Sequence, residues 1–242
     1  MATKNNMMKR TNNKSKKAVA SNKFYDKKKL LLEIIPVAIM LALFVIAFIV
    51  YPQLPDKVPI HWNVQGQIDN YGSKFIGVFL IPIIFLIFEV LSVILPAMDV
   101  FKENIKSFYK YYFLMKVLFG VFFLVLYVTT LMPSFGYKIN IAYIIIMAVI
   151  LLFFALGYIM RHVKRNFFIG IRTPWTLSSD KVWEKTHQIG GILFMAISLI
   201  LLILLLLLDT MMIYFIFIGL IILTVIFLMF YSYNLYKKES HK

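Results

Sequence analysis

Six long apolar segments dominate this chain of 242 residues and limit the folds that it can adopt. They are continuous stretches of Leu, Ile, Phe and Val, and they cover residues 30–51, 75–98, 111–132, 141–160, 192–208 and 211–231. A helix needs about 20 apolar residues to cross the hydrocarbon core of a bilayer. Membrane strands, in contrast, alternate apolar and polar residues. The sequence therefore predicts an all-α polytopic membrane protein with six transmembrane helices.

Composition excludes several other classes of protein. Apolar residues make up 61% of the chain and charged residues 15%, which excludes a soluble globular enzyme. The chain contains no cysteine, so it has no disulfides and no thiolate metal site. The first apolar segment is too long for the core of a cleavable signal peptide, and we expect it to be retained as a helix.

The distribution of basic residues predicts the orientation in the membrane. With six crossings the two termini share one side, and basic residues in short loops resist translocation. On the side of the termini we count 23 of the 26 lysines and arginines, while Lys57, Lys74 and Lys138 lie opposite. Both termini are therefore predicted to be cytosolic.

Four regions follow from these predictions. Residues 1–29 form a basic cytosolic arm with few apolar residues, which we expect to be disordered. We interpret this arm as a topology determinant or a contact with anionic lipid, and we expect no direct binding of nucleic acid. Residues 30–110 form a first helical hairpin, residues 111–236 a four-helix region, and residues 237–242 a cytosolic tail.

The outward loop, residues 52–74, is rich in turn-forming residues and is predicted to be a compact, structured loop. The alternation of Val58, Ile60 and Trp62 indicates one short extended piece. We interpret His61 as a surface imidazole in a turn instead of a metal ligand, because no second ligand completes a site. The candidate residues of this loop are Pro55, Pro59, His61, Trp62, Gly66, Asp69 and Tyr71.

The cytosolic loop, residues 161–191, starts with Arg161, Lys164 and Arg165, whose spacing places them on one face at the end of the fourth helix. Its middle is predicted to be non-helical, because Pro174 disfavours helical geometry in the residue before it. Ser178, Ser179 and Asp180 are good helix caps, and we expect a helix that lies in the interface before it turns into the fifth crossing. Arg172 beside Trp175 is interpreted as a binding arrangement.

Glu89 is the ionisable residue placed deepest in an apolar segment, about 14 Å from the cytosolic end at 1.5 Å per residue. Lys116 is near enough to pair with it. The two residues are either an ion pair that fixes the packing of helices or a proton- or cation-linked site. Glu33 is the fourth residue of its segment and is expected to reach the lipid headgroups, so no second buried carboxylate is expected.

Catalytic motifs were not found. The chain has no metalloprotease helix, nucleophile elbow or glycine-rich phosphate loop, and its four histidines lie far apart in the sequence. We therefore expect no enzymatic activity, no cofactor and no metal site.

The stretch from Ile169 to Leu177, followed by Val182 and Trp183, resembles the signature of the SdpI immunity-protein family of bacterial six-helix membrane proteins. The outward stretch from Leu54 to Gly72 resembles a domain of unknown function that often precedes it. The resemblance implies a location in the bacterial plasma membrane and resistance to a secreted membrane-active toxin peptide, and for some members signalling to a cytosolic repressor. Its site residues are Asn166, Gly170, Arg172, Thr173, Pro174, Trp175, Thr176 and Trp183.

The physical features suggest a division of roles within this protein. The outward loop would meet the peptide, while the cytosolic loop would report or stabilise the occupied state. Arg172 would equally suit an anionic headgroup or a phosphate. The alternative function is a small ion- or proton-coupled transporter that uses Glu89.

Overall fold

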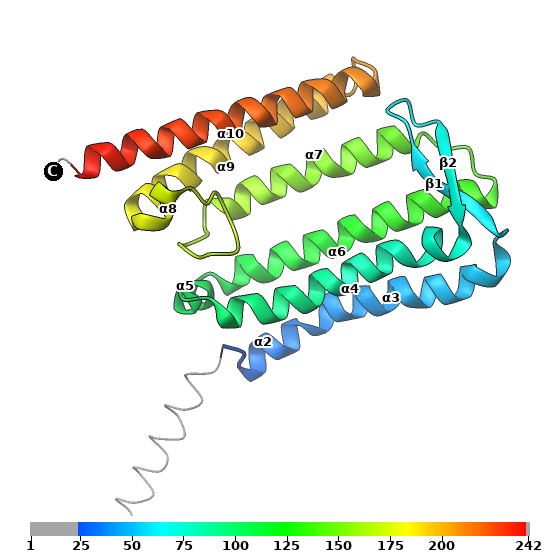
Figure 1. Ribbon diagram of the computed structural model, residues 1–242, viewed down its shortest axis with the longest axis horizontal. Helices are drawn as coiled ribbons and strands as arrows, with labels where there is room; N and C mark the ends of the chain where they lie inside the picture. Colours follow the sequence, from blue (N-terminus) through cyan, green and yellow to red (C-terminus); the bar gives the residue numbers. More distant parts are fainter. Residues whose placement is uncertain (1–23, 241–242) are drawn as a thin grey trace, which may run out of the picture.

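Six long helices form the body of the protein in the computed structural model, which describes residues 24–240 (Figure 1). They are α3 (Ile34–Val50), α4 (Lys74–Met98), α6 (Tyr109–Leu131), α7 (Ile141–Met160), α9 (Asp180–Leu204) and α10 (Thr210–Ser240). All six are long and apolar enough to cross a membrane. Large apolar side chains such as Phe48, which is 67% exposed, and Leu206, 78% exposed, cover their outer surfaces. A surface of this kind suits lipid, and the predicted multi-pass membrane fold is confirmed.

Short elements lie at the two ends of this bundle. At one end are α2 (Lys27–Leu32), α5 (Lys102–Ser107), α8 (Pro174–Ser178), the loop of residues 161–173 and the end of α10 (Figure 1). We name this the signature end. At the other, which we name the hairpin end, are η1 (Tyr51–Gln53), β1 (Lys57–Trp62), β2 (Ile68–Ser73) and η2 (Met132–Phe135). That the signature end faces the cytosol stays a prediction from charge.

Residues 24–29 are folded, although they were predicted to belong to the disordered arm. Phe24 is buried, and the Tyr25 hydroxyl donates a hydrogen bond to the carbonyl of Val93 at 3.0 Å. Asp26 then caps α2 by accepting from the backbone N–H of Lys29. The rings of Phe24 and Tyr25 pack against the bundle. The predicted boundary of the arm at residue 29 is therefore wrong. The prediction of disorder for residues 1–23 lies outside the described residues.

The outward loop folds into a two-stranded antiparallel hairpin. β1 contains the predicted extended piece, and β2 pairs with it in a register that places Pro59 opposite Tyr71. The second strand was not predicted, because only Ile68 and Tyr71 in β2 are large and apolar. Gly66 has φ +79° in the connecting turn. Gly72 has no positive φ, and instead leaves room for the side chain of Ile60.

Three buried clusters hold the helices together. One joins α3, α4 and α6 through residues such as Leu43, Phe85 and Tyr127. A second joins α7, α9 and α10, and a third closes the signature end around Ile105 and Trp183. Close packing of α7 on α9 depends on Gly157 and Gly191, since a Cβ on Gly191 would lie 2.4 Å from the carbonyl oxygen of Gly157.

The signature end differs from the prediction in three ways. Residues 174–178 form α8, because proline is well suited to the first position of a helix. Thr173 is extended, as expected. Helix α9 runs without a break from Asp180 to Leu204, so the interfacial helix is part of the fifth crossing. Helix α7 ends at Met160, so Arg161, Lys164 and Arg165 do not share a helical face.

Candidate functional site

A cavity of about 750 Å³ lies between the hairpin and the adjacent ends of α6, α7 and α10. Most of its lining is apolar, and the hairpin contributes residues 60–64. The tip of the hairpin is held on the helices by Gly66, which lies against Ala142, and by Gln65, whose Nε2 lies 3.4 Å from Met211 Sδ. Ligand pockets have volumes of about 300–1,000 Å³ and are mostly apolar with a few polar groups. This cavity has both properties.

The polar groups at its rim include His61, whose Nδ1 lies 2.6 Å from Asp69 Oδ1 across the two strands. Sequence analysis did not pair these residues, because their contact depends on β2. Both side chains are largely exposed, with 65% and 41% of their surface accessible. Among residues 24–240 no group of three histidines or acids is close enough to hold a metal ion. The pair is therefore an exposed polar contact that ties β1 to β2.

The other candidate residues of the outward loop divide between the cavity and the solvent. Trp62 lines the cavity, and its indole nitrogen is buried with no hydrogen-bond partner among the described residues. Tyr71 is 56% exposed on β2. Pro55 precedes β1 and Pro59 lies within it, and neither residue lines the cavity. The structure thus places His61 and Trp62, but not the whole candidate set, at the apolar cavity.

At the signature end, Asn166 organises the loop that follows α7. Its side chain is fully buried and accepts hydrogen bonds from the N–H groups of Phe168 and Ile169 at 2.8 and 2.7 Å. Its amide nitrogen donates to the carbonyls of Lys164 and Ile169. Four bonds satisfy this side chain completely. Asn166 therefore shapes the loop and leaves no group free for a ligand.

Gly170 is required by its backbone and by its surroundings. It has φ +110°, and a Cβ at this position would lie 2.3 Å from Nε2 of His187. That nitrogen accepts the N–H of Ile171 at 2.9 Å, while Nδ1 lies 2.8 Å from the carbonyl of Trp183. Since a carbonyl only accepts and an N–H only donates, the imidazole is neutral with its proton on Nδ1.

Trp183 fixes the same region from α9. Its ring stacks on His187 at 4.0 Å between centroids, and its Nε1 donates to the carbonyl of Val163 at 2.8 Å. Only 1% of the residue is exposed. The aromatic pair therefore joins the start of α9 to the loop after α7. Its burial points to a structural contribution and not to ligand contact.

Thr173, Pro174 and Thr176 build the start of α8. Each threonine hydroxyl accepts the backbone N–H of the other, which is a reciprocal capping box, and Pro174 occupies the first helical position. The Thr173 hydroxyl also lies 3.1 Å from that of Ser232 on α10. The loop of residues 161–173 is thereby connected to α10, the last crossing of the membrane.

Arg172 and Trp175 are not brought together as a binding pair. The Arg172 side chain is exposed and donates to the carbonyl of Phe167, whereas Trp175 packs against Tyr233 of α10 at 5.1 Å. In the part of the chain that the structure describes, the arginine placed over an aromatic ring at this end is Arg165, 4.6 Å from Phe101. The expectation of an arranged arginine–indole site is wrong, because α8 turns the indole toward α10.

Sequence analysis missed Asp99, which joins two loops. Its Oδ1 accepts the N–H of Phe101 at 2.7 Å and its Oδ2 accepts that of Phe167 at 2.9 Å. The rings of Phe101 and Phe167 stack at 5.5 Å. The sequence does show an acid directly after an apolar segment. It does not show the partner of this acid, Phe167, which is 68 residues away.

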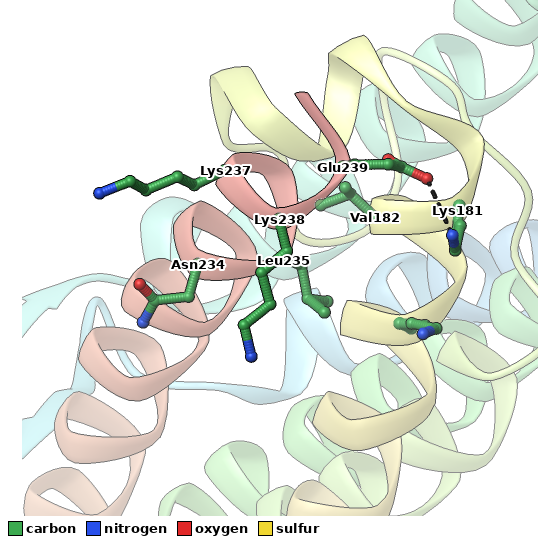
Figure 2. A pocket seen from close by; sticks show the side chains of 8 residues that line it. Lys181, Val182, Asn234, Leu235, Lys237, Lys238 and Glu239 are labelled. Carbon is green, nitrogen blue, oxygen red and sulfur yellow. Dashed lines mark ion pairs between the residues drawn. The ribbon is translucent and has the colours of Figure 1, made fainter. Parts of the chain in front are cut away.

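A basic groove of about 590 Å³ lies at the signature end, between the first turns of α9 and the last turns of α10 (Figure 2). Four lysines line it: Lys181, Lys185, Lys237 and Lys238. Glu239 neutralises part of this charge, since its Oε1 lies 3.4 Å from Lys181 Nζ. Its other oxygen accepts a hydrogen bond from the hydroxyl of Ser179. The excess of positive charge favours an anionic group.

Within the membrane, α4 and α6 bring Glu89 and Lys116 together, with Lys116 Nζ 3.0 Å from Glu89 Oε2. Lys116 also pairs with Glu33, to which the Tyr109 hydroxyl donates. Glu33 is buried, so the expectation that it reaches the headgroups is wrong. Helix α2 ends just before Glu33, and Pro36 lacks the N–H that would continue the hydrogen bonds. This break directs Glu33 inward.

The matches to known proteins follow the same division of the chain. The model of the Domain of unknown function (DUF1648) matches residues 38–86, which contain most of α3, the hairpin and part of α4. The model of the SdpI/YfhL protein family matches residues 162–232, which contain most of the loop of residues 161–173, together with α8, α9 and most of α10.

The chain is 29% identical to the "Immunity protein SdpI" of Bacillus subtilis (strain 168) over 205 residues. The alignment covers 85% of this chain and 96% of that protein. No solved structure matches the chain significantly. The order of the two matched regions, their coverage of both ends of the bundle and the similarity along most of both chains agree, and together they relate this chain to the SdpI/YfhL protein family.

Proposed function

We propose that this protein protects a bacterial membrane against a secreted, membrane-active toxin peptide by binding apolar side chains of the peptide at the hairpin end. The observation that carries the proposal is the similarity to an immunity protein along nearly its whole length. The apolar cavity under the hairpin gives a physical basis for it. A peptide whose apolar residues enter this cavity is withheld from the lipid, where it would act.

The test is to fill the cavity without changing the rest of the protein. Ile145 on α7 lines the cavity and is partly accessible, so Ile145→Trp should occupy the space that a peptide side chain needs. Leu151 is on the same helix, is 49% exposed and does not line the cavity. Leu151→Trp is therefore the matched control.

Both variants would be expressed in a sensitive bacterium that is challenged with candidate membrane-active peptides. We expect Ile145→Trp to reduce protection to the level of cells without the protein, and Leu151→Trp to protect as well as wild type. Immunoblots of membranes must show equal abundance of the three proteins. Full protection by an equally abundant Ile145→Trp protein would contradict peptide binding in this cavity.

A cytosolic repressor is proposed as a second partner, at the signature end. Arg172 is exposed there, and the lysines of the basic groove lie on the neighbouring helices α9 and α10. This surface suits an acidic face on the repressor. Replacing Lys237 and Lys238 by glutamine should weaken its recruitment to membranes and leave protection intact. Unchanged recruitment of candidate repressors would remove this part of the proposal.

A small ion- or proton-coupled transporter is the alternative function, and one observation favours it. In the half of the bundle that contains α3, α4 and α6, Lys116 is in contact with two acids, Glu33 and Glu89. Transport predicts that protection requires Glu89 and collapses when the proton gradient is dissipated. Peptide binding predicts that Glu89→Gln and the loss of the gradient both leave protection intact.

A further inference from the structure

The buried cluster of Glu33, Lys116 and Glu89 contains one acid more than base. These residues are 8%, 0% and 4% exposed. Among residues 24–240 no lysine or arginine except Lys116 forms an ion pair with either acid. With both acids ionised, the cluster would carry one uncompensated negative charge within the bilayer. Such a charge is strongly unfavourable unless a cation neutralises it.

The other groups that face the cluster supply no positive charge. The hydroxyls of Tyr25, Tyr109 and Tyr112 donate to the Val93 carbonyl, to Glu33 and to the Ser92 carbonyl respectively. Burial, with the nearby acids as a smaller cause, raises the pKa of Tyr25, so this phenol stays neutral. Lys29 lies over the ring of Tyr109 but pairs with Asp26, outside the cluster.

Hydrogen bonding distinguishes the two acids. Glu33 accepts from the Tyr109 hydroxyl and from Lys116, and both donors stabilise its ionised form. Glu89 lies beside Lys116, but the angles of this contact are not those of a hydrogen bond. Neither of its buried oxygens has another hydrogen-bond partner among the described residues. The uncompensated negative charge is therefore that of Glu89, and the positive charge that would neutralise it is needed there.

We propose that this cluster is a proton-binding site, in which Glu33 and Lys116 form the ion pair and Glu89 is held as the neutral carboxylic acid at neutral pH. The proton comes from water, and its uptake forms an O–H bond on the Glu89 carboxylate. The cluster is then neutral as a whole. This inference is independent of the proposed immunity function, since it concerns only the charge balance of the first three crossings.

Infrared spectroscopy tests the proposal directly on the full chain reconstituted in vesicles of ether-linked phosphatidylcholine, a lipid without ester carbonyl groups that would absorb in the same region. A protonated carboxyl group gives a carbonyl band above the amide bands, and the band shifts when the sample is exchanged into D₂O. We expect this band in wild type at pH 7 and its loss in Glu89→Gln, which retains the shape of the neutral acid. Glu89→Asp retains an acid and should shift the band, so the test does not depend on one variant.

Glu103→Gln is the control, because Glu103 is an exposed acid on α5 that pairs with Lys106. It should leave the band unchanged. Lys116→Met removes the one positive charge of the cluster, so the carbonyl absorption of protonated acid should double in that variant. The absence of a band in wild type at pH 7, or a band of full intensity in Glu89→Gln, would overturn the proposal.

Discussion

Gly170 offers the sharpest test of the signature end, because its replacement by alanine has two separable costs. The residue has φ +110°, where a side chain is strained by about 1–2 kcal/mol. The new Cβ would also lie 2.3 Å from Nε2 of His187 and displace the ring. The partly buried N–H of Ile171 would then lose its acceptor, which costs about 1–3 kcal/mol. We expect Gly170→Ala to destabilise the protein by about 2–5 kcal/mol in all.

Two other glycines separate these costs. Gly136 has φ +84°, but a Cβ added there would have no neighbouring atom within 4 Å, so Gly136→Ala should cost only the backbone strain, about 1–2 kcal/mol. Gly219 lies in α10 with neither positive φ nor a close neighbour, and Gly219→Ala should stabilise the protein by about 0.5–1 kcal/mol.

The assay is equilibrium unfolding of the purified protein in detergent micelles, followed by tryptophan fluorescence. Trp183 stacks on His187, so its emission reports on the displaced ring as well as on unfolding. We expect the order of stability Gly219→Ala, wild type, Gly136→Ala, Gly170→Ala. If Gly170→Ala costs no more than Gly136→Ala, the close approach to His187 is not a feature of the protein.

Three further predictions follow from single contacts. His187→Gln should retain most of the stability that His187→Ala loses, because the side-chain carbonyl of glutamine can accept the N–H of Ile171. Unfolding in micelles measures the difference. Equal losses in the two variants would contradict the role of His187 as the acceptor. Cysteines introduced at Gln67 and Ser178 should react differently with an impermeant thiol reagent on intact cells, with labelling at position 67 only; the reverse pattern would overturn the predicted orientation. Arg172→Ala should change stability by less than about 1 kcal/mol in the same unfolding assay, since its side chain is exposed; a larger loss would show a buried role.

The sequence was sufficient for features that depend on local chemistry. Each crossing needs only a long apolar segment, and the cap of α9 needs only Ser179 before a helical pattern. The extended geometry of Thr173 follows from the ring of the next residue. Strand β2 was missed because its apolar pattern is weak, and the contact of His61 with Asp69 was missed with it.

Features that depend on distant contacts were not predictable in this way. Glu33 is an ordinary residue near a helix end by its position, and it becomes buried because Lys116, 83 residues later, lies opposite it. Asp99 likewise meets Phe167 across a long stretch of chain. Trp175 is beside Arg172 in sequence, yet α8 directs its ring toward Tyr233.

Residue order alone determined that this chain crosses a membrane six times, because the free energy of moving an apolar segment into lipid depends on that segment by itself. It also identified residues 169–177 as the segment that resembles the family signature. The tertiary structure alone decided which polar groups meet inside the bundle and that a cavity lies under the hairpin. The physical reason is that ion pairs and cavities depend on how helices pack against one another, and that packing is set by side chains far apart in the chain.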